Sequence, residues 1–212
     1  MLARTLTDME RRTFLRASIA TAGVATLAGC LASGEDGDAP DPVDLSGTKF
    51  DYQGGMEIGA HGGPNGQVFY EDETPQPAAG SGASGDDHES LAWFHTLVFG
   101  LFPYHFDRRE RGWDAAAIYV TDYSRVDWNL NSSSDTRVMP APTSADSFAD
   151  ATGLTYVGGS EVMGGMGPGL HPFSDEQEAN SFAETYGGTT YAYDDVDRAL
   201  VESLQEQGDH ET

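Results

Sequence analysis

The stretch from Ser174 to Tyr193, SDEQEANSFAETYGGTTYAY, carries the clearest structural signal in the chain. Ser174 and Gln177 have the spacing of a capping box, which marks the first turn of a helix. Apolar residues then recur every three or four positions, as on the buried face of a helix: Ala179, Phe182, Ala183 and Tyr186. Gly187 is a natural residue after a helix, and Thr189–Tyr193 is typical of a strand. The stretch therefore predicts a helix followed by a strand.

Shorter signals on both sides predict further strands and helices. Short apolar runs predict strands at residues 67–70, 115–120 and 154–157. A run rich in Leu, Phe, Trp and Ala predicts a helix from Ser90 to Phe102, which Pro103 would end. A last helix is expected from Asp194 to Gln207, with Val196, Leu200 and Leu204 on one face. Because strands and helices alternate in small units, the expected fold class is α+β with modest sheets.

The N-terminus has the pattern of an export signal. Arg11 and Arg12 precede a weakly apolar run from Ala17 to Ala28, and Leu-Ala-Gly-Cys ends at Cys30. An arginine pair of this kind indicates the twin-arginine (Tat) route, and the last four residues form a lipobox, in which the cysteine is lipidated. The apolar run is well short of the roughly 20 residues that span a bilayer. We expect a lipid anchor on the outer face of the cytoplasmic membrane; the alternative is an amphipathic N-terminal helix of the mature protein.

Cys30 is also the only cysteine of the 212 residues. The mature body therefore has no disulfide, thiolate nucleophile or thiolate metal site. This excludes several classes of enzyme and metal centre that depend on paired cysteines.

The charge of the chain is strongly negative. The sequence has 35 acidic and 11 basic residues, a formal net charge of -24 and a single lysine, Lys49. Acidic residues spread along the whole length are typical of a salt-adapted, haloarchaeal-type surface, because molar salt screens self-repulsion over about 3 Å. We expect no nucleic-acid partner, and the Gly-rich segment 158–169 lacks the lysine of a phosphate-binding loop, so no nucleotide is expected either.

Polar stretches rich in Gly, Pro, Ser and Asp divide the chain into segments. They lie at residues 31–44, 73–89 and 129–147. About 180 residues follow the signal, enough for one core or two small ones. We expect the following segments: a signal peptide at 1–29, a disordered lipidated tether at 30–47, an N-terminal α+β unit at 48–112 with a flexible loop at 73–89, a C-terminal α+β unit at 113–207, and a tail at 208–212.

A family resemblance rests on four motifs in the second half of the chain. They are Tyr156-Val157-Gly158-Gly159-Ser160, Met166-Gly167-Pro168, His171-Pro172-Phe173-Ser174 and Tyr186-Gly187-Gly188. In this order they resemble the C-terminal half of the NosL family, lipoproteins that assist copper delivery to nitrous oxide reductase. The resemblance covers residues 115–201 well. Upstream, Tyr119–Tyr123 fits a family segment, and Gly54-Gly55-Met56 stands where the family has Cys-Gly-Met.

The resemblance implies a fold of two small related units, each a short antiparallel or mixed sheet with a helix. It also implies a Cu(I) site, but this chain has Gly54 in place of the family's copper-binding cysteine. Cu(I) prefers soft donors, so thioethers and imidazole are the remaining candidates. The metal site predicted on this basis comprises Met56, His61, Met163 and Met166, all in Gly-rich segments.

Each candidate ligand also has a structural interpretation. Met56 could fill a small core, as methionine often does. His61 could be an exposed turn residue, and Met163 could pack beneath its loop; only Met166 matches the family's loop. We interpret His95, within LAWFHTLVF, as a hydrogen-bonded helix residue, and His105 and His171 rank lower still as ligands.

Three classes of function follow from these observations. The leading hypothesis is a non-catalytic, membrane-anchored copper carrier for an exported metalloenzyme such as nitrous oxide reductase, or for its maturation machinery. A metal-free docking or assembly factor of the same family is the alternative, and Gly54 favours it. An enzyme of the organomercurial lyase type, whose fold is similar, would require thiolates that the body lacks. Separately, Asn131-Ser132-Ser133 is a possible N-glycosylation sequon.

Overall fold

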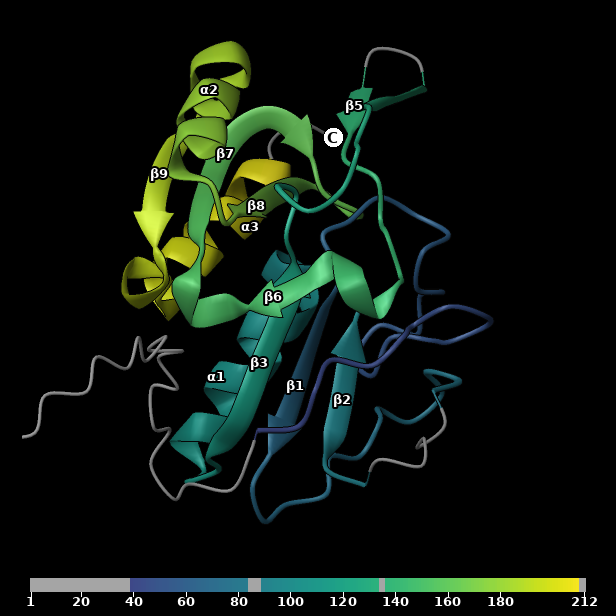
Figure 1. The fold of residues 1–212 in the computed structure, drawn as a ribbon. Coiled ribbons are helices and arrows are strands. Elements are labelled where there is room, and N and C mark those ends of the chain that lie inside the picture. Colours follow the sequence, from purple (N-terminus) through teal and green to yellow (C-terminus); the bar gives the residue numbers. More distant parts are fainter. Residues whose placement is uncertain (1–38, 84–88, 134–135, 210–212) are drawn as a thin grey trace, which may run out of the picture. The chain divides into compact units, whose positions relative to one another are not determined.

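The computed structural model describes residues 39–83, 89–133 and 136–209. Its first sheet has the strand order β2-β1-β3-β6, with all neighbours antiparallel (Figure 1). These strands are β1 (Gly66–Tyr70), β2 (Leu91–Phe94), β3 (Ala115–Thr121) and β6 (Phe148–Asp150). All residues of β1 and β2 are buried, as expected for strands that are covered on both faces.

The second sheet is built around the long strand β7 (Thr155–Met163). β8 (Pro168–Phe173) and β9 (Thr189–Ala192) both pair with β7 in the antiparallel direction. β5 (Thr136–Val138) pairs in parallel with the C-terminal end of β7. β4 (Asn131–Ser133) completes the sheet as the antiparallel neighbour of β5. A register shift between Gly158 and Met163 interrupts the β7–β8 ladder, which resumes where Met163 pairs with Pro168 at the end of β7.

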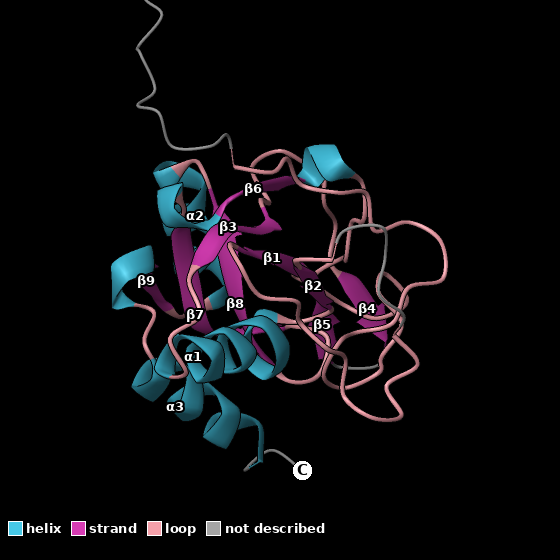
Figure 2. Cartoon of the chain, turned by 90° about the horizontal axis from the view of Figure 1, so that it is seen from below, coloured by secondary structure: helices cyan, strands magenta, loops and turns pink. Residues whose placement is uncertain are grey.

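Three α-helices accompany these sheets among the described residues: α1 (Phe102–Glu110), α2 (Glu176–Tyr186) and α3 (Arg198–Asp209). A π-helix (Leu97–Leu101) leads into α1, and short 3-10 turns lie at Ala145–Ser147, Ala151–Gly153 and Tyr193–Asp195. α2 packs on β7 and β8, while α3 lies beside α1 (Figure 2). The observed fold class is α+β with antiparallel and mixed sheets, which confirms the prediction.

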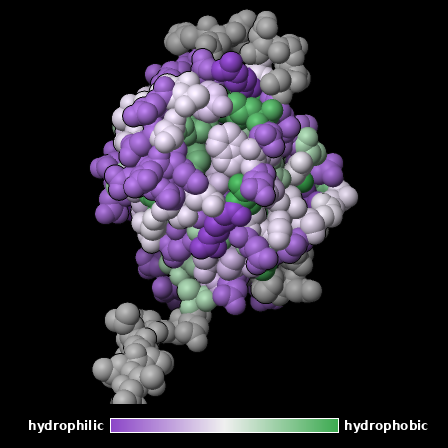
Figure 3. Space-filling model, turned by 45° about the horizontal axis from the view of Figure 1, so that its top comes forward, coloured by the Kyte–Doolittle hydropathy of each residue, from purple (hydrophilic) through white to green (hydrophobic). Residues whose placement is uncertain are grey.

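The surface is predominantly hydrophilic on the face shown in Figure 3, with apolar patches between polar ones. Met166 is the large apolar side chain that stands exposed among the described residues, with 54% of its surface accessible. No helix in the described part of the chain has the length and apolar character needed to cross a membrane.

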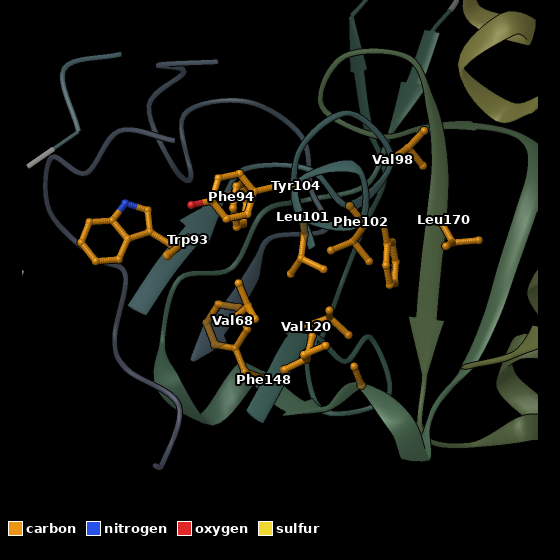
Figure 4. Close-up of a cluster of buried hydrophobic side chains, with 14 of the residues drawn as sticks. Val68, Trp93, Phe94, Val98, Leu101, Phe102, Tyr104, Val120, Phe148 and Leu170 are labelled. Atoms are coloured by element: carbon orange, nitrogen blue, oxygen red, sulfur yellow. The ribbon is translucent and has the colours of Figure 1, made fainter. Parts of the chain in front are cut away.

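The main core lies between the first sheet and the helices (Figure 4). Phe102 of α1 packs against Tyr156 of β7, with ring centroids 6.2 Å apart. Val201 and Leu204 of α3 belong to the same core as Val68 of β1. A smaller cluster beneath α2 contains Tyr123, Met139, Val157, Val162, Phe173, Ala179 and Phe182.

The two sheets do not divide at the expected boundary between residues 112 and 113. β3 and β6 lie after it in sequence but pair within the first sheet, next to β1. The main core also contains residues of both sheets, and Asp38–Thr212 forms one compact unit. The chain has two sheets, and residues of both contribute to the main core.

The described part of the expected tether, residues 39–47, contacts the first sheet. The side-chain amide of Gln67 bonds both backbone groups of Val43, at 2.9 and 2.7 Å. The Tyr119 hydroxyl donates to the Pro40 carbonyl at 2.8 Å, and Leu45 is fully buried. These contacts fix residues 40–45 to the first sheet, whereas residues 30–38 of the expected tether lie outside the described residues.

The predicted helix from Ser90 to Phe102 is the largest error in secondary structure. Leu91–Phe94 instead forms β2, since it pairs with β1 over four residues. The helix begins later, where the Thr96 hydroxyl accepts from the N–H of Phe99. Pro103 lies in the first turn of α1, which follows the π-helix directly, so it does not end the helix.

Other predicted elements are correct with shifted ends. The N-cap of α2 is Asp175, whose carboxylate accepts from Gln177 and Glu178, and not Ser174. The last helix begins at Arg198, after a 3-10 turn, rather than at Asp194. β4 and β5 lie within the stretch 129–147 that was expected to be a loop. Residues 71–83 contain no helix or strand, and residues 84–88 of the expected flexible loop are outside the described residues.

Candidate metal centre

A buried carboxylate and a buried imidazole form the best-defined polar pair in the structure. His95 follows β2 directly and is 2% exposed, and Asp51, from the preceding loop, is 1% exposed. Nδ1 of His95 lies 2.8 Å from Oδ2 of Asp51, and the His95 backbone N–H donates to the same oxygen at 2.9 Å. Because an ionised carboxylate only accepts, this contact places the imidazole proton on Nδ1.

Asp51 also organises the loop that contains Gly54 and Met56. Its Oδ1 accepts from the backbone N–H groups of Gln53 and Gly54, both at 2.7 Å. Burial raises the pKa of the Asp51 carboxyl, but hydrogen bonds from the His95 side chain and from the Gly54 and His95 N–H groups outweigh burial and hold this pKa below its ordinary value. One ionised carboxylate thus ties the loop 51–56 to the imidazole of His95.

The other ring nitrogen of His95 has no protein partner. Nε2 is buried and makes no hydrogen bond among the described residues. With Nδ1 protonated, Nε2 presents a lone pair. A histidine held in this way by a carboxylate is the usual arrangement of a metal ligand, so the site fits a soft or borderline cation.

The loop between β7 and β8 packs against this imidazole. A Cβ added to Gly165 would lie 3.3 Å from Cδ2 of His95 and 2.4 Å from the carbonyl oxygen of Gly62. Glycine is therefore required at residue 165, because any side chain would collide with the Gly62 backbone. The loop meets both His95 and the segment that follows His61.

The four predicted ligands lie in three different segments of the chain. Met163 ends β7 and is half-buried, and Met166 is exposed in the loop beside Gly165. His61 is exposed and directly precedes Gly62. Met56 is half-buried, and its carbonyl accepts from the Asp51 N–H at 2.8 Å. His95, which the sequence interpretation ranked low, has a buried ring nitrogen without a hydrogen-bond partner among the described residues.

The sequence held one weak signal for His95, its place at the end of an apolar run. We interpreted that run as a helix, so His95 appeared to be an ordinary helical residue. Its partner Asp51 is 44 residues earlier and becomes a neighbour only through the loop that precedes β1. No spacing rule connects residues so far apart.

Gly54 leaves the loop open where the resemblance implies a ligand. A Cβ at Gly54 would have one atom of another residue within 4 Å, Oδ1 of Asp51 at 3.8 Å. Within the described residues, no group of three or more His, Cys, Asp or Glu side chains is arranged to hold a metal. A site here would therefore depend on thioethers in addition to imidazole.

Two other buried histidines, His171 and His105, have lowered pKa values. Burial lowers the pKa of His171 to about 4, although the backbone contact to Val162 opposes this effect. Its Nε2 lies 3.0 Å from the Val162 carbonyl oxygen. Burial, and then the charge of Arg109, lower the pKa of His105 to about 4.

The remaining predicted sites are those of glycosylation, lipidation and export. Asn131 is exposed in β4, so it stays a candidate for N-glycosylation. The proposed lipidation site Cys30 and the signal arginines Arg11 and Arg12 lie outside the described residues.

Comparison with known proteins decides the family. The family model described as NosL matches residues 42–201. The chain belongs to the NosL family. Among curated NosL proteins, it is 30% identical over 99 residues to "Copper-binding lipoprotein NosL" of Stutzerimonas stutzeri, a match that covers 45% of this chain and 46% of the relative. The chain thus aligns with about half the length of this relative.

A solved NosL structure is also similar. The crystal structure of the copper chaperone NosL from Shewanella denitrificans has a TM-score of 0.47 and 21% sequence identity, and the match covers 79% of this chain and 97% of that chain. The match to the family model, over residues 42–201, includes Asp51, Gly54, His95 and the β7–β8 loop.

Proposed function

We propose that this NosL-family chain binds copper as Cu(I) and carries it, without catalysis, to an exported metalloenzyme such as nitrous oxide reductase or to its maturation machinery. The observation that carries the proposal is the buried, unpartnered Nε2 of His95 beside a loop that holds Met163 and Met166. Imidazole and thioether donors together suit Cu(I). The copper-binding description of the relative from Stutzerimonas stutzeri supports the same cargo.

The proposed ligands are His95 and Met166, with Met163, Met56 and His61 as further donors. His95 is preoriented by Asp51, so binding requires little rearrangement on that side. Met166 is exposed, which lets a partner reach the ion. A site without a thiolate holds Cu(I) less tightly than one with it, which favours transfer over storage.

We further propose that the protein is exported by the Tat route and is held on the outer face of the cytoplasmic membrane by a lipid on Cys30. A mature chain anchored in this way presents copper to exported partners. The proposal rests on the signal and lipobox residues in the sequence.

A Cu(I) titration tests the copper proposal. The mature chain, with Cys30→Ala so that the single thiol cannot bind, is titrated anaerobically against a colorimetric Cu(I) chelator in molar KCl. We expect stoichiometric binding that His95→Gln and Met166→Leu each weaken. His105→Gln, which changes a buried histidine outside the proposed site, is the control and should leave the affinity unchanged.

The open position at Gly54 favours a second candidate function, a metal-free docking or assembly factor for an exported protein. The same titration separates the two candidates. If the Cys30→Ala chain does not compete with the chelator at all, the copper-carrier proposal is wrong and the docking factor becomes the better hypothesis.

A further inference from the structure

Three polar atoms gather where the second half of α1 meets the end of β1. They are the hydroxyls of Tyr70 and Tyr104 and Nε of Arg108, each buried and without a hydrogen-bond partner among the described residues. Tyr70 is 1% exposed and Tyr104 is 6% exposed. We call these three residues the tyrosine–arginine cluster.

Ring contacts hold the cluster together. The guanidinium carbon of Arg108 lies 4.3 Å from the ring centroid of Tyr104 and 5.0 Å from that of Trp113. The rings of Tyr70 and Trp113 pack edge to face with centroids 5.0 Å apart. The Tyr70 ring also stacks with the His105 ring, with centroids 6.2 Å apart. Arg108 is thus fixed against two aromatic rings, and its charge acts on the Tyr70 hydroxyl.

The unpartnered atoms define the chemistry of a ligand. Nε of Arg108 can only donate, and each tyrosine hydroxyl can donate as well. Leaving a buried donor unpaired costs about 1–3 kcal/mol, so three donors at one place favour a species that accepts from all of them. A small acceptor without donors of its own fits this requirement.

The local charge favours an anion. Burial raises the pKa of the Tyr70 hydroxyl, the neighbouring Tyr104 raises it further, Arg108 lowers it, and Glu73 has a smaller opposite effect. Arg108 therefore outweighs Glu73 at this hydroxyl.

We propose that Tyr70, Tyr104 and Arg108 form a binding site for a small monovalent anion such as chloride. The site is independent of the copper function, because none of its residues belongs to the proposed metal centre. It joins α1 to the first sheet through the ion, in place of a direct hydrogen bond. In a chain with a net charge of -24, Arg108 is one of few cations available for such a role.

Thermal unfolding of the mature full chain in detergent tests the proposal. Potassium chloride is compared with potassium gluconate at equal ionic strength, for the unsubstituted chain and for Tyr70→Phe/Tyr104→Phe, which keeps both rings but removes both hydroxyls. We expect chloride to raise Tm by about 2–4 °C more in the unsubstituted chain than in the double variant. General salt effects cancel in this difference.

Tyr119→Phe is the matched control, because its hydroxyl already donates to the Pro40 carbonyl. It should keep the full chloride effect. If the unsubstituted chain and the double variant respond equally to chloride, the three atoms bind only water and the proposal is wrong.

A second measurement does not depend on the variants. A crystal of the mature chain grown in bromide should show an anomalous peak within hydrogen-bond distance of the Tyr70 and Tyr104 hydroxyls. Density without anomalous signal at that position, in a crystal with full access to bromide, would overturn the anion assignment.

Discussion

Asp51 has two roles at the residue scale. It accepts four hydrogen bonds, two from the loop that carries Gly54 and two from His95. These bonds determine both the position of the loop and the tautomer of the imidazole. The affinity of the proposed copper site should therefore depend on a residue that does not touch the ion.

Replacing this carboxylate should weaken copper binding. Asp51→Asn retains the size of the side chain but can no longer stabilise a proton on Nδ1 of His95 as strongly. We expect the Cu(I) dissociation constant to rise about 10–100-fold, as for other residues that orient a ligating histidine. Chelator competition measures the change. Asp44→Asn, which alters an exposed carboxylate bonded to Ser46, is the control, and equal affinities in the two variants would contradict the prediction.

Gly54 offers the opposite experiment. The space around its Cα accommodates a side chain, so Gly54→Cys should add a thiolate without disturbing the loop. We expect Cu(I) binding at least about 10-fold tighter in the same titration, because Cu(I) prefers thiolate to thioether. Gly153→Cys places a thiol at another open position away from the site. The prediction fails if both cysteines tighten binding equally.

Buried histidines should make stability depend on pH. The pKa values of His105 and His171 are both about 4, below the usual 6.5 of an unfolded chain. The unfolded state therefore binds more protons in this range, and each histidine's contribution is complete above about pH 6.5 and is lost as pH falls towards 4. For each histidine, the shift corresponds to a loss on the order of 3 kcal/mol in the free energy of unfolding.

Chemical denaturation at a series of pH values between 7.5 and 4.5 checks this dependence. His105→Phe removes one of the two groups and keeps a flat ring against Tyr70. The slope of unfolding free energy against pH should fall in this variant. An unchanged slope would mean that His105 is accessible to protons in the folded state.

At the scale of elements, the β7–β8 loop meets the segment after His61 through backbone atoms and the residues after β2 through side-chain atoms. Gly164 and Gly165 lie against the carbonyl oxygens of Gly63 and Gly62, and the absence of side chains allows the approach. The geometry of the proposed metal centre thus depends on close packing of glycines more than on side-chain bonds.

Gly165→Ala tests this dependence. The new methyl group would lie 2.4 Å from the Gly62 carbonyl, so the two segments must separate. We expect a loss of about 1–3 kcal/mol in unfolding free energy, together with weaker Cu(I) binding. Denaturant titration gives the first quantity. Gly153→Ala, at a position with open space, should cost much less; similar losses in both variants would exclude a specific contact.

Local signals explain which elements could be predicted from the sequence. α2 and β9 were predicted because the apolar spacing of the helix and Gly187 after it are signals contained in a short stretch of sequence. β2 was mistaken for a helix, since only its pairing with β1 determines its conformation. The methionines and glycines of the β7–β8 loop indicated a candidate site from the sequence alone. His95 was not indicated, because its partner Asp51 and its neighbour Gly165 come from distant parts of the chain.

At the scale of the whole molecule, the acidic surface and the N-terminal signal are the features that sequence predicts most directly. Both depend on composition or on short motifs. The main core, to which both sheets contribute, could not be predicted. It depends on β3 pairing with β1 and on residues of α3 packing in the same core, and these elements are far apart in the sequence.

Membrane attachment gives the whole-molecule prediction. Cys30→Ser removes the proposed lipidation site, so the exported chain should move from the membrane fraction to the soluble extracellular fraction. Fractionation with immunodetection, and the mass of the mature N-terminus, measure this change. Retention of Cys30→Ser chains in the membrane fraction at the level of the unsubstituted protein would contradict a lipid anchor.

The position of α3 has a consequence for the order of events during synthesis. Gln205 donates to the Val98 carbonyl at 2.8 Å, and Arg198 bonds Asp107 and Glu110 of α1. α3 therefore covers elements that leave the ribosome about a hundred residues earlier. A nascent chain that stops before α3 has both sheets but leaves apolar surface of α1 and β8 uncovered, so chaperones and proteases can distinguish an incomplete chain from a finished one.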